Sequence, residues 1–184
     1  NPLKILSFPV KRSIINVGKI QIDIKTMHLG DNLCMNNKQA EKKFPLYFNN
    51  FEIPEWAREQ ELEVFRACAT GKVDRESFMN SFEENGYKIS KDGDEHDPQE
   101  YSLSTYIKFR DVKRFMVMDS RYGVPFVIAK GVTKPVHGIC LETREWKRNL
   151  GIKYKGSHVD WWLYTDAEPY KEFEVFENEN RKDI

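Results

Sequence analysis

The sequence predicts an α+β protein in which a mainly antiparallel sheet packs against a helical hairpin. Strand-like alternation occurs toward both ends of the chain, for example at Ile20, Ile22 and Ile24, whereas helical spacing is concentrated in the middle. Strands and helices do not alternate regularly, as they would in a parallel βαβ sheet. Because there is no internal repeat and no break in composition, we expect one domain over residues 1–178 and a frayed tail over 179–184.

The composition is typical of a folded protein with a well-hydrated surface. The chain has 184 residues, 29 of them basic and 29 acidic, with 40% hydrophobic and 13% aromatic residues. These values exclude a disordered chain, a collagen-like fibre and a strongly basic histone-like protein. No apolar run approaches the ~20 residues that cross a bilayer, and no signal peptide is visible, so we expect a cytoplasmic protein with no membrane partner.

The first fifty residues are expected to be strands followed by loop. Residues 3–10 and 14–24 have strand-like patterns, with Gly18 marking a bulge or turn between two halves. Turn-forming Gly, Asp and Asn residues make 26–50 mostly loop, with a short helix over 38–43.

The first helix of the expected hairpin begins at Pro54. Proline suits the first helical turn, where its missing N–H costs nothing. Leu62, Phe65 and Cys68 then follow at helical spacing, and Gly71 is a typical stop signal. We therefore predict a helix that ends near residue 71.

The second helix of the hairpin is expected after Asp74, which suits the N-cap. Phe78 and Phe82 are four positions apart and would share one helical face. Gly86 would end the helix, and residues 70–73 would form the turn between the two helices.

The rest of the chain predicts short strands around one further helix. We expect strands at 101–106, 126–129, 137–143, 158–165 and 172–176, and a helix at 107–118. The helix would turn Val112, Phe115 and Met116 inward.

No metal site is expected. The polar stretch 91–100 is interpreted as an exposed loop; a calcium loop is the alternative, although only Asp92 and Asp94 match a fragment of that pattern. The three cysteines, Cys34, Cys68 and Cys140, are far apart and predict reduced thiols. The four histidines are scattered, whereas a structural zinc site needs about four N or S ligands.

Three motifs recur in an order that suggests chemistry. Arg66 lies in Val-Phe-Arg-Ala, a Ser-Leu-Ser-Thr motif spans 102–105, and Glu172 and Glu174 form a Glu-x-Glu pair near the C-terminus. This order resembles the arginine-serine-glutamate type of ADP-ribosyltransferase. That family has its arginine on a strand, whereas the spacing here places Arg66 on a helix, and the central motif departs from Ser-Thr-Ser.

The resemblance implies an NAD-dependent transferase with an unknown acceptor. Arg66 would grip the pyrophosphate with charge-assisted hydrogen bonds. The motif would hold the nicotinamide ribose through Ser102, Ser104 and Thr105. Glu174 would be the catalytic carboxylate, stabilising positive charge as the glycosidic bond breaks, and Glu172 would orient the acceptor from the same strand face.

A second resemblance covers most of the chain. The segments 65–72, 75–78, 101–105, 128–131 and 157–164 are similar to small uncharacterised bacterial and mobile-element proteins. This likeness implies a cytosolic prokaryotic protein and brings no activity with it.

The aromatic strand at 158–164 is the second candidate site. His158, Asp160, Trp162 and Tyr164 would share one face, where Trp162 beside His158 could stack on a base or a nicotinamide ring. A cysteine nucleophile, formed by Cys140 with His158 and Asp160, is a further possibility.

The alternative to a transferase is a non-enzymatic binding module for nucleic acid or a protein partner. Residues 144–155 carry five basic residues and one acidic residue, and Lys153-Tyr154-Lys155 alternates charge with an aromatic ring. The module would combine this segment with the 158–164 strand. A structural accessory protein with no ligand site is the third interpretation.

Overall fold

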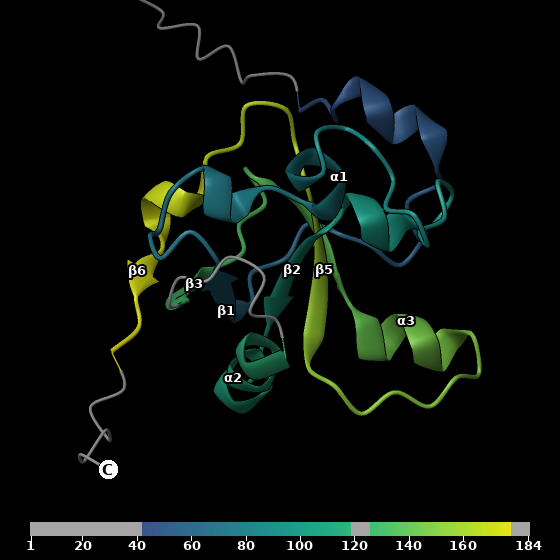
Figure 1. Cartoon of the computed structure of the whole chain (residues 1–184). Helices are drawn as coiled ribbons and strands as arrows, with labels where there is room; N and C mark the ends of the chain where they lie inside the picture. Colours follow the sequence, from purple (N-terminus) through teal and green to yellow (C-terminus); the bar gives the residue numbers. More distant parts are fainter. Residues whose placement is uncertain (1–41, 119–125, 178–184) are drawn as a thin grey trace, which may run out of the picture. The chain divides into compact units, whose positions relative to one another are not determined.

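The computed structural model describes residues 42–118 and 126–177 (Figure 1). The strands predicted at 3–10 and 14–24, and the tail at 179–184, lie outside the described residues. All described residues belong to one compact unit, Ala40–Ile184. The single domain over 1–178 therefore stays a prediction.

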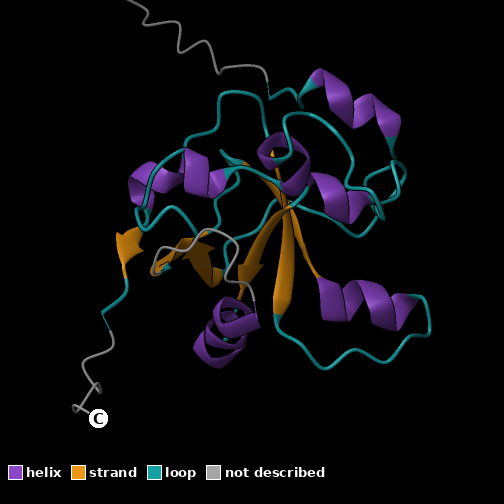
Figure 2. Cartoon of the chain, viewed as in Figure 1, coloured by secondary structure: helices purple, strands orange, loops and turns teal. Residues whose placement is uncertain are grey.

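A six-stranded antiparallel sheet organises this unit (Figure 2). Its strands are β1 (Glu63–Cys68), β2 (Leu103–Tyr106), β3 (Val127–Val132), β4 (Gly138–Glu142), β5 (His158–Leu163) and β6 (Glu174–Val175). They are arranged in the order β4-β5-β2-β1-β3-β6, and every neighbouring pair is antiparallel. The predicted α+β class with a mainly antiparallel sheet is confirmed.

The helices are short. The α-helices are α1 (Ser81–Glu84), α2 (Phe109–Met118) and α3 (Thr143–Asn149), and the 3-10 helices are η1 (Leu46–Asn50), η2 (Glu76–Phe78), η3 (Pro98–Tyr101) and η4 (Pro169–Glu172). In the described part of the chain, every helix falls short of the length and apolarity that a bilayer span requires.

The first helix of the predicted hairpin is wrong, because its residues form the central strand β1. All residues from Val64 to Cys68 are buried, since both faces of the strand are covered. A strand buried on both faces shows no two-residue alternation, so the chance spacing of Leu62, Phe65 and Cys68 resembled a helix.

The second predicted helix is broken into η2 and α1, so there is no helical hairpin. Asp74 does cap a turn, because its carboxylate accepts from the Ser77 N–H at 3.0 Å. Asn80 then starts α1 through a reciprocal capping box with Glu83. Gly86, at φ +66°, ends the segment as expected, in a conformation that glycine adopts without strain.

The predictions for the C-terminal half are largely confirmed. Strands β2 to β5 and helix α2 fall within one to three residues of their expected bounds. Helix α3 was not anticipated. Glu172 lies in η4 and Glu174 lies in β6. The prediction that the two glutamates share one face of a strand is therefore wrong.

Side chains from both faces of the sheet form the core. On one face, Phe65 and Ala67 pack against Val112 of α2. On the other face, a larger cluster contains Val64, Cys68, Phe78, Leu103, Ala129, Cys140, Val159, Trp161 and Phe173. A third cluster links the β4–β5 end of the sheet to η1, α1 and α3 through Phe48, Phe51, Phe82, Tyr101, Leu141, Trp146 and Trp162.

Candidate functional site

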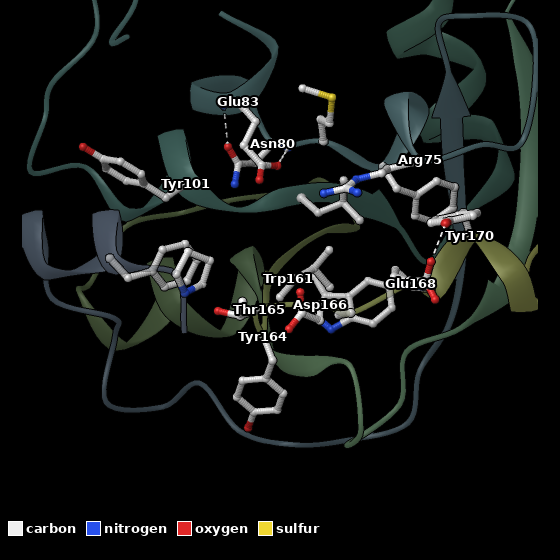
Figure 3. A pocket seen from close by; sticks show the side chains of 18 of the residues that line it. Arg75, Asn80, Glu83, Tyr101, Trp161, Tyr164, Thr165, Asp166, Glu168 and Tyr170 are labelled. Atoms are coloured by element: carbon white, nitrogen blue, oxygen red, sulfur yellow. Dashed lines mark hydrogen bonds between the residues drawn. The ribbon is translucent and has the colours of Figure 1, made fainter. Parts of the chain in front are cut away.

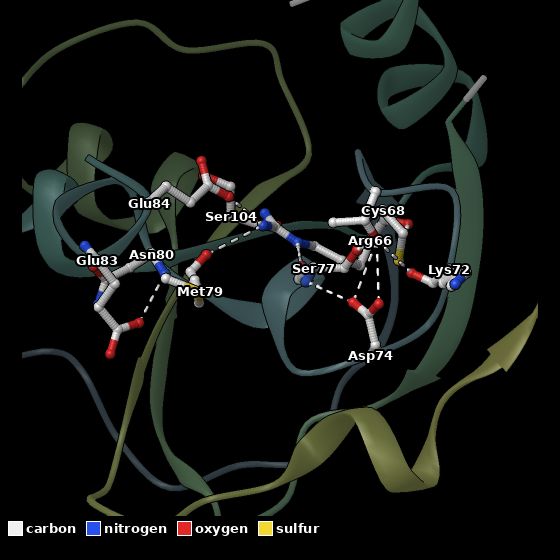
Figure 4. Close-up of polar contacts among 11 residues, drawn as sticks. Arg66, Cys68, Lys72, Asp74, Ser77, Met79, Asn80, Glu83, Glu84 and Ser104 are labelled. Atoms are coloured by element: carbon white, nitrogen blue, oxygen red, sulfur yellow. Dashed lines mark hydrogen bonds and ion pairs between the residues drawn. The ribbon is translucent and has the colours of Figure 1, made fainter. Parts of the chain in front are cut away.

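Arg66 lies on β1, not on a helix, and its guanidinium is buried between segments (Figure 4). Its Nε donates to the Ser77 carbonyl at 2.9 Å and its Nη1 to the Ser104 carbonyl at 2.8 Å. Its Nη2 lies 3.3 Å from the Met79 carbonyl and 3.5 Å from Glu84 Oε1. Arg66 therefore ties β1 to β2 and to the loop that carries η2 and α1.

This arrangement brings the predicted arginine and serine motif together, but in a structural role. Backbone pairing between β1 and β2 is limited to Phe65 with Tyr106, and the Arg66 side chain bridges the strands beyond that pair. Most of the N–H donors of Arg66 are used by backbone carbonyls. An arginine that grips a pyrophosphate would need those donors for the ligand. Arg66 thus holds β1, β2 and the loop of η2 and α1 together.

A buried carboxylate, Asp160, lies on β5, the strand that pairs with the serine motif of β2. Asp160 pairs in register with Ser104 and is fully buried. Ser102 Oγ donates to its Oδ1 at 2.9 Å, and Thr143 Oγ1 donates to its Oδ2 at 2.7 Å. Gln99 Nε2 lies 3.1 and 3.3 Å from the two oxygens. The carboxylate is therefore held by three side-chain donors.

His158 extends this network by one step. Its Nδ1 lies 2.7 Å from Thr143 Oγ1 and 3.6 Å from Asp160 Oδ2. A threonine hydroxyl has one proton, which it donates to the carboxylate, so His158 must carry a proton on Nδ1 and donate it to Thr143. The result is a directed chain from His158 through Thr143 to Asp160.

The network decides the ionisation of Asp160. Burial alone would raise its pKa, but the contacts with His158 and the hydrogen bonds from Thr143 and Gln99 outweigh burial and lower the pKa below its usual value. Asp160 is therefore ionised at neutral pH.

The remaining residues expected to contact a cofactor are mostly inside the protein. Thr105 is fully buried and donates to the Val159 carbonyl. Trp162 is also fully buried, and its indole N–H donates to the Pro98 carbonyl at 2.9 Å. The expected stacking platform at Trp162 is thus a core residue, because both faces of β5 are covered.

An open cavity of about 530 Å³ lies over the face of the sheet that carries Leu103, Trp161 and Leu163 (Figure 3). Its volume is within the ~300–1,000 Å³ that is usual for small-molecule sites. Seven of the side chains that line it are aromatic: Tyr47, Phe48, Phe78, Tyr101, Trp161, Tyr164 and Tyr170.

Two charged side chains on one wall of the cavity differ in their surroundings. Glu83 is fixed, because Tyr47 Oη donates to it at 3.0 Å and the Asn80 N–H at 3.1 Å. Burial, and then the Glu83 charge, raise the pKa of Tyr47, so the phenol stays protonated as a donor. Arg75 is exposed, and its guanidinium makes no hydrogen bond or ion pair with a described residue.

The wall also contains an unsatisfied donor. Trp161 lines the cavity and is fully buried, and its Nε1–H has no hydrogen-bond partner among the described residues. A buried donor without an acceptor costs ~1–3 kcal/mol.

Glu172 and Glu174 do not belong to the cavity wall. Glu174 pairs with Lys130, which pairs with Phe65 on the face that α2 covers. The cavity lies over the opposite face. Glu172 forms an ion pair with Lys134 and lies 3.5 Å from His137 Nε2, and the hydrogen bond from Lys134 is the main cause of its lowered pKa.

The cysteine nucleophile and the metal alternatives gain no geometric support. Cys140 pairs with Trp161 and Asp160 pairs with Leu141, so the thiol and the carboxylate lie on opposite faces of the sheet. Burial raises the pKa of Cys140, which disfavours the thiolate. In residues 42–118 and 126–177, no cluster of His, Cys, Asp and Glu could hold a metal ion.

Several residues of these sites were missed from the sequence. The Asn80-x-x-Glu83 spacing is a readable capping box that also fixes the cavity carboxylate. Gln99 and Thr143 carry no such signal, because they are 61 and 17 positions from Asp160 and meet it only in the folded sheet. Arg75 has no distinguishing pattern.

Comparisons with protein-family models, with curated proteins and with solved structures found no match for this chain.

Proposed function

We propose that this protein is a divergent ADP-ribosyltransferase-like protein that binds NAD in the aromatic cavity. The observation that carries the proposal is the cavity itself, in which Arg75 and the fixed carboxylate of Glu83 line an aromatic wall. The strand position of Arg66 beside Ser104 supports the proposal, since the resembling family also has its arginine on a strand.

The roles differ from those that the motifs alone suggest. Arg75 would meet the diphosphate of NAD, because an exposed guanidinium offers a forked, charge-assisted contact. Arg66 is a positioning residue, since its Nη2 lies 3.3 Å from the carbonyl of Met79, which lines the cavity. The aromatic side chains would hold the planar rings.

The cavity wall carries acidic side chains as well as the guanidinium of Arg75, as a ligand with both cationic and anionic groups requires. Glu83, Asp166 and Glu168 are acidic, and Glu168 is tied to Lys171 and Tyr170. The nicotinamide ring of NAD is cationic and would be stabilised by the acidic part, whereas the diphosphate requires Arg75.

The chemistry requires a carboxylate near the ribose. In the proposed step, the bond between ribose C1 and the nicotinamide nitrogen breaks, and nicotinamide leaves with the electron pair. The acceptor, or water, then bonds to C1 and loses a proton. Glu83 would stabilise the positive charge on the ribose, because two donors hold it in one orientation.

Calorimetric titration with NAD tests the proposal. Arg75→Ala should weaken binding about tenfold or more, because a charge-assisted contact to phosphate is lost. Glu83→Gln should retain binding and abolish release of nicotinamide, measured by chromatography; glutamine also serves in a capping box, so α1 should persist. Lys72→Ala, an exposed change outside the cavity wall, and Glu174→Gln are the matched controls.

The outcomes are distinct. Saturable binding that Arg75→Ala weakens and the controls leave unchanged would support the NAD site. Absence of saturable binding up to millimolar NAD, or equal affinity of Arg75→Ala and the wild type, would overturn it. Binding with no nicotinamide release from the wild type would reject the transferase step and leave a binding protein.

A further inference from the structure

Helix α3 and the loop that follows it, both seen in Figure 1, carry a positively charged surface that shares no residue with the cavity wall. We define this basic surface by its five cations: Arg144, Lys147, Arg148, Lys153 and Lys155. The acidic residue within it, Glu145, is neutralised by Arg58, whose two terminal nitrogens each lie 3.2 Å from one of its oxygens. The local charge is therefore strongly positive although the chain is neutral overall.

The loop exposes apolar groups between these charges. Leu150 and Ile152 are each 52% exposed and Tyr154 is 37% exposed, and every residue from 148 to 155 is exposed. Apolar side chains thus alternate with Gly151, Lys153 and Lys155. Exposed apolar groups that are flanked by cations are more typical of an interaction surface than of a loop that only contacts solvent.

The basic surface contains a hollow, and a hydrogen-bonded arginine holds part of its loop in place. A hollow of about 410 Å³ lies among Arg144, Arg148, Gly151, Ile152, Lys153, Tyr154 and Lys155. Arg144 donates to the carbonyls of Lys155 and Gly156 at 3.1 and 3.2 Å, which fastens the end of the loop to α3. The side chains of Arg148, Lys153 and Lys155 form no hydrogen bond or ion pair with any residue that the structure describes.

We propose that the basic surface binds single-stranded nucleic acid. The cations would contact phosphates, and Tyr154 would stack on a base that enters the hollow. A duplex is disfavoured, because α3 has seven residues and buries Trp146 against the sheet, so it presents no recognition face to a groove. A lipid surface is disfavoured, because the exposed apolar side chains Leu150 and Ile152 lie in a loop and not on an amphipathic helix of the kind that lies in a membrane interface.

This proposal is independent of the NAD site. The sequence-based alternative is a binding module formed by the 144–155 segment and the 158–164 strand. The present proposal keeps the 144–155 segment as the binding surface. It leaves out the 158–164 strand, because the residues of that strand are at most partly exposed.

Fluorescence polarisation with a labelled oligothymidylate of about 12 nucleotides tests the proposal. We expect saturable binding that weakens as salt rises, because phosphate contacts release counterions. The double variant Lys153→Glu with Lys155→Glu should weaken binding about tenfold or more and reduce the dependence on salt. Tyr154→Ala should weaken binding without changing that dependence, since it removes stacking and no charge.

The matched control is Lys88→Glu with Lys91→Glu, which makes the same charge change at two exposed lysines outside the basic surface. Equal loss in the control would show that only net charge matters and would overturn the assignment. No binding to the oligonucleotide, tighter binding to a duplex of the same length, or preferential binding to anionic vesicles would also overturn it. Circular dichroism spectra of all variants exclude unfolding as the cause.

Discussion

Replacing Asp160 by asparagine removes one negative charge from the interior of the sheet and leaves the shape of the side chain unchanged. Ser102, Thr143 and Gln99 donate hydrogen bonds to this carboxylate, and His158 reaches it through Thr143. Asparagine offers one acceptor oxygen in place of two and adds an NH₂ group that faces these donors. At least one buried donor therefore loses its acceptor.

The magnitude follows from the hydrogen bonds. A hydrogen bond to a charged group contributes ~1.5–3 kcal/mol, and a buried donor left without a partner costs ~1–3 kcal/mol. These contributions overlap, so we expect Asp160→Asn to lower the free energy of unfolding by about 3 kcal/mol. At ~2–4 °C per kcal/mol for a chain of this size, the melting temperature should fall by about 6–12 °C.

The effect should depend on pH. Because the pKa of Asp160 is lowered in the folded state, its stabilisation is present above the unfolded pKa of ~3.9 and is lost as the pH falls through the folded pKa. The difference between wild type and Asp160→Asn should thus be full at neutral pH and should shrink below about pH 4.

Urea unfolding of both proteins across this pH range measures the difference. Glu174→Gln, an exposed carboxylate change on β6, should alter stability by less than about 0.5 kcal/mol. An Asp160→Asn protein as stable as the wild type at neutral pH would refute the inference of an ionised, hydrogen-bonded carboxylate.

Three further predictions concern packing, capping and thiol reactivity. Gly138→Ala should destabilise the protein by ~1–3 kcal/mol in urea unfolding, because the added methyl would meet the Trp162 carbonyl oxygen, a backbone atom that cannot rotate away; unchanged stability would contradict the close approach of β4 and β5. Asn80→Ala should cost ~1 kcal/mol, since it removes the side-chain half of the capping box, whereas Asn80→Ser should recover most of the loss. Burial raises the pKa of Cys68 to about 11, so iodoacetamide at pH 8 should alkylate it slowly in the folded protein and quickly in urea, as followed by mass spectrometry; equal rates would show that the thiol is exposed.

The elements that the sequence predicted well are those with one covered face or a clear helical period. Helix α2 turns Val112 toward the sheet and leaves charged residues outward, so its amphipathic pattern is local and readable. In β2 the burial alternates along the strand, which produces the expected two-residue pattern.

The elements that the sequence mispredicted are those whose environment depends on distant segments. Strand β1 is central, and because α2 covers one face and η2 and η4 the other, its residues are buried without alternation. Helix α3 begins directly after strand β4 and is rich in charged residues. Its sequence therefore shows no helical repeat of apolar residues that would predict it. The prediction that Arg66 lies on a helix is wrong for the same reason, because it depended on the helix predicted where β1 lies.

The amino-acid sequence by itself determined the α+β class, most strands of the C-terminal half and the basic segment at 144–155. These properties depend on composition and on spacing between neighbours, which act through local geometry. Only the tertiary structure decided which polar groups meet. It placed Arg66 beside Ser104, put Asp160 among donors distant in sequence, and separated Glu174 from the cavity, because strand order and register set those distances.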